Sequence, residues 1–86
     1  MTLSFTDEGW AGYLSWTGDA RALKRIHRLI ADIQRNGKRG IGKPEPLTGG
    51  WSGWWSRRID DQHRLVYRET ASGVEIAQCR GHYGDR

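Results

Sequence analysis

The sequence predicts an α+β domain in which two N-terminal helices pack on a mainly antiparallel sheet. Residues 3–6 alternate apolar and polar side chains, as a half-buried first strand does. Two helical patterns follow, over about 8–17 and 20–36, and three short strand-like runs come after them, at about 54–59, 63–69 and 74–80. With 86 residues and no internal repeat, we expect a single domain spanning 1–86.

The two predicted helices have recognisable beginnings. Asp7 is the expected N-cap of the first helix, and Asp19 is the expected N-cap of the second. Gly37 suits the position just after the second helix ends. This longer helix carries one apolar stripe, which we expect to be buried and which consists of Leu23, Ile26, Leu29, Ile30 and Ile33.

The composition limits the classes of function. Fourteen Lys and Arg against ten Asp and Glu give a net charge of +4, which favours a polyanionic partner such as nucleic acid, although solubility alone explains it equally well. The single cysteine, Cys79, allows no intrachain disulfide and no Cys-based zinc site. No apolar run approaches the roughly 20 residues of a membrane span. We therefore expect a soluble, cytoplasmic protein without a membrane partner.

A glycine-rich stretch of roughly 15 residues, between 37 and 53, is predicted to be a long loop, and such loops are often functional. Within it, Glu45 lies between Pro44 and Pro46, which favour an extended backbone at Glu45. A carboxylate pinned in this way suits a general base, while an ordinary exposed loop acid is the alternative. Lys43 is a candidate phosphate contact.

Five arginines fall in the predicted sheet: Arg57, Arg58, Arg64, Arg68 and Arg80. A guanidinium on a sheet face can bind a phosphate through two hydrogen bonds. Strand alternation places Arg57 and Arg58 on opposite faces, so at most one of them faces a given site. For Arg64 the alternative is an ion pair with Asp60 or Glu75.

Aromatic and histidine side chains complete the set of candidates. Trp54 can stack on an unpaired base, as can its neighbour Trp51, whereas Trp55 is expected in the core. His82, near the end of the chain, can protonate a leaving oxygen at neutral pH, although an idle terminal histidine is the alternative. The acids and histidines of the hairpin and the C-terminus match no metal-ligand spacing, so neither a metal nor another cofactor is expected.

Four ordered segments, 42–47, 52–59, 63–67 and 80–83, closely resemble the YoeB (Txe) toxins of the RelE superfamily, and the similarity covers nearly the whole chain. The resemblance implies a RelE-like fold and a type II toxin–antitoxin system in which the toxin cleaves mRNA in the ribosomal A site without a metal. Under it, Glu45 matches the general base, Arg64 the phosphate-stabilising arginine, His82 the general acid, and Tyr83 a residue that positions RNA.

The resemblance also implies partners: a YefM-like antitoxin, the 70S ribosome with its mRNA, and operator DNA bound through the toxin–antitoxin complex. It leaves a homodimer open. The chain departs from the family pattern by a short extension over 84–86 and by Thr48, Gly49 and Gly50, where relatives often carry basic residues. These departures leave a rival interpretation, a basic RNA-binding or corepressor module that binds an antitoxin without cleaving RNA.

Overall fold

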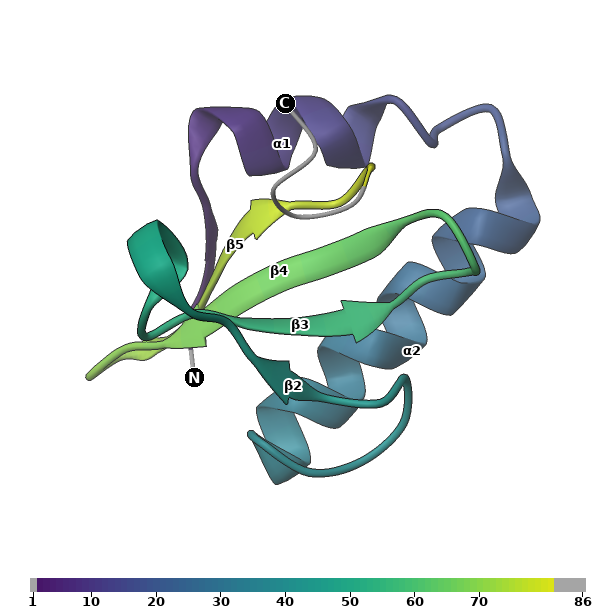
Figure 1. The fold of residues 1–86 in the computed structure, drawn as a ribbon. Coiled ribbons are helices and arrows are strands. Elements are labelled where there is room, and N and C mark those ends of the chain that lie inside the picture. The colour runs from purple at the N-terminus through teal and green to yellow at the C-terminus, as the bar shows by residue number, and fades with distance from the viewer. Residues whose placement is uncertain (1, 82–86) are drawn as a thin grey trace.

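A computed structural model describes residues 2–81 of the chain. Its elements, drawn in Figure 1, are in chain order β1 (Thr2–Phe5), α1 (Asp7–Leu14), α2 (Ala20–Asn36), β2 (Glu45–Pro46), the 3₁₀ turn η1 (Gly49–Trp51), β3 (Trp55–Arg58), β4 (Arg64–Glu69) and β5 (Gly73–Gln78). None of the helices in this part of the chain is both long and apolar enough to cross a bilayer.

The strands form one five-stranded sheet in the order β1-β5-β4-β3-β2. The β1–β5 pair is parallel and the other three pairs are antiparallel, which confirms the predicted fold class. The prediction of an uninterrupted loop over 37–53 is wrong, because Glu45 and Pro46 pair with β3 as a fifth strand. Proline has no N–H and cannot donate a hydrogen bond to a neighbouring strand. A strand that contains Pro46 is therefore suited to the edge of the sheet, where β2 lies.

Helix α2 forms as the sequence predicts. The side chain of Asp19 accepts a hydrogen bond from the N–H of Ala22, and Gly37 ends the helix at a φ of 64°. The stripe residues Ile26, Leu29, Ile30 and Ile33 are buried, while Leu23 packs beside them. They contact Leu65, Tyr67, Val74 and Ile76 on one face of the sheet, which forms the main core. Figure 1 shows α2 passing behind this sheet.

Helix α1 differs from its prediction at both ends. Thr6, not Asp7, is its N-cap, because the Thr6 hydroxyl accepts from the N–H of Gly9, and the helix ends at Leu14. The helix lies against β5 through a glycine: a Cβ at Gly9 would collide with the carbonyl oxygen of Ile76. Trp10 therefore stays 48 % exposed, even though it belongs to the apolar pattern of the helix.

The sheet face opposite α2 has its own smaller cluster. Leu47, Val66 and Ala77 are buried there, with Trp51 and Trp54 packed against them. This cluster lies toward the end of the face near η1, whereas the other end carries charged side chains. We call this side of the sheet the open face.

Candidate active site on the open face

Strand pairing brings the acid and two arginines of the prediction onto the open face. Glu45 is paired with Ser56, and Ser56 is paired with Val66, which belongs to the open-face cluster. Cross-strand partners share a face, so Glu45 lies on this side. Arg58 and Arg64 are paired with each other, two residues further along the same strands and therefore on the same face.

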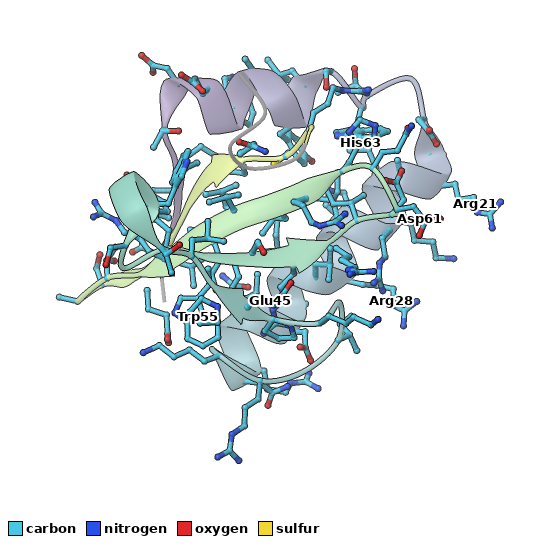
Figure 2. The ribbon with its side chains drawn as sticks, in the orientation of Figure 1. Arg21, Arg28, Glu45, Trp55, Asp61 and His63 are labelled. Atoms are coloured by element: carbon cyan, nitrogen blue, oxygen red, sulfur yellow. The ribbon has the colours of Figure 1, made fainter. Side chains whose placement is uncertain are left out.

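Glu45 is exposed, and its backbone is fixed by the sheet. The N–H of Leu47 donates to the carbonyl of Trp54 at 2.9 Å, which holds β2 against β3. Figure 2 shows Glu45 on β2, at the front of the sheet and away from α2. Two strand spacings and two residue rises place the Cα atoms of Glu45 and Arg64 roughly 12 Å apart. Both side chains leave the backbone on the same side of the sheet, as two groups that act on one phosphodiester linkage must.

The Arg64 side chain is 7 % exposed, at the start of β4. Its Nη1 donates to the main-chain carbonyls of Asp60, Asp61 and His63 at 2.8, 3.3 and 3.2 Å. The other two nitrogens make no hydrogen bond with the described residues. Arg64 forms no ion pair within residues 2–81, so the alternative of a pair with Asp60 or Glu75 is wrong. The turn positions the guanidinium, and residues 2–81 use only one of its nitrogens.

Asp60 stabilises the turn that holds Arg64. Its carboxylate accepts from the N–H groups of Gln62 and His63 at 2.9 and 2.7 Å. Burial raises the pKa of Asp60, but these two hydrogen bonds and nearby positive charge together outweigh burial, so the net pKa lies below the ordinary value. The turn is thus most stable with this carboxylate ionised.

Arg58 carries an unused donor on the same face. Its backbone is fixed, because its N–H donates to Gly42 at 2.7 Å and its carbonyl accepts from Arg25 Nη2 at 3.2 Å. Its Nε is buried and has no hydrogen-bond partner among residues 2–81. Buried donors in native proteins are nearly always satisfied. An anion on the open face could accept from this nitrogen only after the Arg58 side chain moved, because the atom is buried.

Arg57 lies on the other side of β3, and the prediction that it binds RNA phosphate is wrong. It is completely buried, and its guanidinium uses all five N–H groups internally. The acceptors are the Tyr67 hydroxyl, the Asp32 carboxylate and the carbonyls of Gly37, Arg39 and Ile41. The adjacent arginines 57 and 58 thus have opposite roles, as strand alternation requires.

The buried Arg57 organises the loop between α2 and β2. Its hydrogen bond holds the pKa of Asp32 below the usual value, and burial raises the pKa of Tyr67. Asp32 in turn accepts from the N–H of Ile41 at 3.1 Å. Gly40 has a φ of 125°, and a Cβ there would collide with the Asp32 carboxylate. The loop that leads into Glu45 is therefore fixed from inside the protein.

The remaining predicted RNA contacts occupy three different environments. Lys43 is exposed and has a φ of 51°, unusual for a residue with a side chain, at the entry to β2. Trp54 is half-buried on the open face under the Arg68 guanidinium, which lies 4.7 Å from its ring centroid. Arg80 lies over Trp16, with its guanidinium 3.7 Å from the ring centroid, at the C-terminal end of α1.

His82, Tyr83 and the extension over 84–86 lie outside the described residues. The chain reaches His82 through Gly81, whose carbonyl accepts from the Arg64 N–H at 2.9 Å. The described chain therefore ends beside Arg64. Thr48, Gly49 and Gly50, where the chain departs from the family pattern, are exposed at η1.

Two further groups bear on the chemistry. Within residues 2–81 no cluster of three or more His, Cys, Asp or Glu side chains is placed to hold a metal ion. Cys79 is buried in the main core, and burial raises its pKa to about 12. A neutral thiol in that position is a poor nucleophile.

The backbone of the chain matches the crystal structure of YafQ from Escherichia coli with a TM-score of 0.78 over 94 % of this chain and 92 % of that one, and the identity of 12 % supports a shared fold alone. The sequence itself shows the family. The model of the YoeB-like toxin of bacterial type II toxin–antitoxin systems matches residues 5–83, and the chain belongs to this family.

Individual relatives agree with that assignment. The chain is 55 % identical to Toxin YoeB of Streptomyces coelicolor over 84 residues, covering 96 % of this chain and all of that one. It is 49 % identical to Toxin YoeB of Escherichia coli K12 over 84 residues, with the same coverage. Among solved structures, the YoeB/ParE toxin from Agrobacterium tumefaciens is 44 % identical, with a TM-score of 0.91 over 96 % of this chain and 100 % of that one.

Proposed function

We propose that this toxin is a ribosome-dependent endoribonuclease that cleaves mRNA in the A site by acid–base chemistry without a metal. The observation that supports the proposal most is the placement of Glu45, Arg58 and Arg64 on one open face of the sheet. A base and two guanidinium groups share this face, and Arg58 brings a donor without a partner among the described residues.

In the proposed reaction, Glu45 accepts the proton of a ribose 2′-OH, and the oxygen attacks the adjacent phosphorus. Arg64 donates to the phosphoryl oxygens, where negative charge develops in the transition state. His82 gives a proton to the departing 5′ oxygen, and Tyr83 positions the RNA. The products are a 2′,3′-cyclic phosphate and a 5′-OH, so atoms and charge balance without another reactant.

RNA binding would involve the charged and aromatic groups around this centre. Arg58 contacts the same phosphate or its neighbour, Lys43 contacts the backbone at the entry to β2, and Trp54 offers a surface for a base. Arg80 contributes positive charge near the last described residues. We assign Arg57 no contact with RNA because its donors are already used.

We also propose an antitoxin partner. A YoeB–YefM complex from Staphylococcus aureus contains a chain 36 % identical to this one, with a TM-score of 0.87 over 96 % of this chain and 98 % of that one. A YefM-like antitoxin is therefore the proposed inhibitor, and the resulting complex would repress its operon through operator DNA. A YoeB dimer from the same organism supports a homodimer as a second assembly. These events belong to the cytoplasm, where ribosomes and operator DNA are found.

The test is cleavage of a defined mRNA on purified 70S ribosomes. Glu45→Gln and His82→Gln should each lower the rate at least about 100-fold, the low end for general acid–base groups. Glu69→Gln is the matched control, since Glu69 is an exposed acid whose side chain lies on the α2 side of the sheet by strand alternation. It should cleave like the wild type, and all three variants should still bind the antitoxin.

Three results would contradict the proposal. Glu45→Gln and His82→Gln cleaving as fast as the wild type would remove the acid–base mechanism. A wild type that binds the ribosome and the antitoxin but leaves the mRNA intact would support the non-catalytic module instead. Chelator in the purified reaction should not reduce the toxin's cleavage rate, provided the Mg²⁺ that ribosomes require is restored; a selective loss would indicate a metal nuclease.

A further inference from the structure

His63 joins two parts of the molecule that lie far apart in the sequence. It precedes Arg64 at the end of the hairpin turn, and its Nδ1 accepts a hydrogen bond from the N–H of Gly81 at 2.8 Å. The next N–H along the chain, that of Arg64, donates to the carbonyl of the same glycine at 2.9 Å. Gly81 is therefore held through both of its main-chain polar groups by two consecutive residues, and Gln78 Nε2 also donates to its carbonyl at 3.2 Å. The Gly81 N–H is held by His63.

The His63 ring is itself held in place. Its backbone is fixed by the turn, where its N–H donates to Asp60 and its carbonyl accepts from Ile59 at 2.9 Å. Its ring meets the buried Trp16 edge-on, with centroids 5.0 Å apart and an interplanar angle of 87°. The indole of Trp16 donates to the carbonyl of Cys79 at 2.8 Å. Figure 2 shows His63 near α1, well away from Glu45.

The hydrogen bond from the Gly81 N–H indicates which nitrogen of the His63 ring carries the proton. An Nδ1 that accepts from an amide must be unprotonated, so the neutral ring carries its proton on Nε2. Gly81 has a φ of 84°, and a Cβ there would meet no atom of residues 2–79 within 4 Å. Since Gly81 has no side chain, its position depends on the hydrogen bonds that its own N–H and carbonyl make.

We propose that His63 is a positioning residue for the C-terminal segment, whose first residue after Gly81 is His82. The proposal rests on the proposed function, in which His82 is the general acid. By fixing Gly81 beside Arg64, the His63 imidazole sets where the chain carrying that acid begins relative to the phosphate-binding guanidinium. Misplacing a catalytic group by about 1 Å can cost as much as roughly 100-fold in rate.

Two substitutions separate positioning from packing. His63→Asn keeps an acceptor close to where Nδ1 lies but loses the ring on Trp16, whereas His63→Phe keeps a ring and loses the acceptor. Positioning predicts that His63→Asn cleaves ribosome-bound mRNA within a few-fold of the wild type and that His63→Phe is about 10- to 100-fold slower. A packing role predicts the reverse order, and that order would overturn the proposal.

A double-mutant comparison tests whether His63 acts through His82. If it does, adding His63→Phe to His82→Gln should slow cleavage no further, because the acid is already gone. An additional 10-fold loss in that background would instead mean that His63 acts independently, for example by contacting RNA directly, and would overturn the proposal.

Hydrogen exchange of the Gly81 amide gives a readout that does not depend on activity. The exchange rate should rise at least about 10-fold in His63→Phe and stay near the wild-type value in His63→Asn. Equal protection in both variants would overturn the proposal. If the wild type fails to cleave mRNA under any condition, the proposed function fails, while the exchange experiment still decides whether His63 holds Gly81.

Discussion

Arg57 and Arg64 show what distinguishes the two faces of this sheet. Both are buried: Arg57 is 0 % exposed and Arg64 is 7 % exposed. On the α2 face, Arg57 donates all five of its N–H groups to protein acceptors, one of them the Asp32 carboxylate. On the open face, Arg64 donates through one nitrogen only among the described residues. The first is a closed structural site, and the second keeps donors for a ligand.

The difference shows how a small basic protein can use the same side chain for two purposes. A buried cation is costly unless it is paired and fully hydrogen-bonded. Arg57 meets that requirement internally and in doing so fixes the loop that leads to Glu45. On the open face this requirement is not fully met, because the buried Nε of Arg58 has no hydrogen-bond partner among residues 2–81. An unsatisfied donor among the described residues, on the same face as an exposed carboxylate, indicates a binding face rather than a core.

Removing Arg57 should have the largest effect on stability. Arg57→Ala removes the buried cation that pairs with the Asp32 carboxylate and donates to three loop carbonyls. Breaking an ion pair of this kind costs about 3–5 kcal/mol. Urea unfolding followed by tryptophan fluorescence measures the change. Arg58→Ala is the matched control on the open face, with an expected loss of no more than about 1 kcal/mol. Equal losses for the two variants would contradict the contrast between the faces.

Lowering the pH should also destabilise the Arg57–Asp32 site, by less than Arg57→Ala does. The pKa of Asp32 is lowered from its usual 3.8, chiefly by the hydrogen bond from Arg57. The unfolded chain therefore takes up this proton at higher pH than the folded one, so the stabilisation is present above the unfolded pKa and is lost as the pH falls through the folded pKa. Asp32→Asn should flatten this acid limb of the stability profile.

Asp60 serves as the comparison for the acid limb. Its pKa is also lowered, so its contribution has the same sign, but its partners are main-chain N–H groups of the turn rather than a buried cation. Asp60→Asn should therefore leave the Asp32 part of the limb intact. Stability profiles of wild type and Asp32→Asn that run parallel between pH 2 and pH 5 would contradict the role assigned to the Arg57–Asp32 pair.

Much of this architecture follows from local sequence patterns. The stripe and caps of α2 and the hairpin around residues 60–62 are determined by periodicity and turn chemistry, which act over a few residues. Alternation also predicts correctly that Arg57 and Arg58 lie on opposite faces. It cannot say which of them is buried, because that depends on Asp32 and Tyr67, residues brought to β3 by tertiary packing.

One wrong prediction and two missed features have the same origin. The composition of residues 37–53 predicts a loop that includes Glu45, yet Glu45 and Pro46 form an edge strand, where proline is tolerated. The Trp10 pattern indicates a helix but not which side is buried, because α1 docks on β5 through Gly9, which contributes no apolar signal. The hydrogen bond between His63 and Gly81 is also not predicted by local patterns, because the two residues are 18 positions apart. Contacts of this kind are set by the assembled sheet.

The open face as the place of RNA cleavage is tested most directly by single-turnover cleavage of ribosome-bound mRNA with Arg64→Ala. Arg68→Ala is the control from the same strand and face, where Arg68 is already paired with Glu75 at 2.8 Å. Loss of a group that stabilises transition-state charge predicts a rate at least about 100-fold below the wild type for Arg64→Ala and a rate near the wild type for Arg68→Ala. A correctly folded Arg64→Ala protein that cleaves at the wild-type rate would contradict the account.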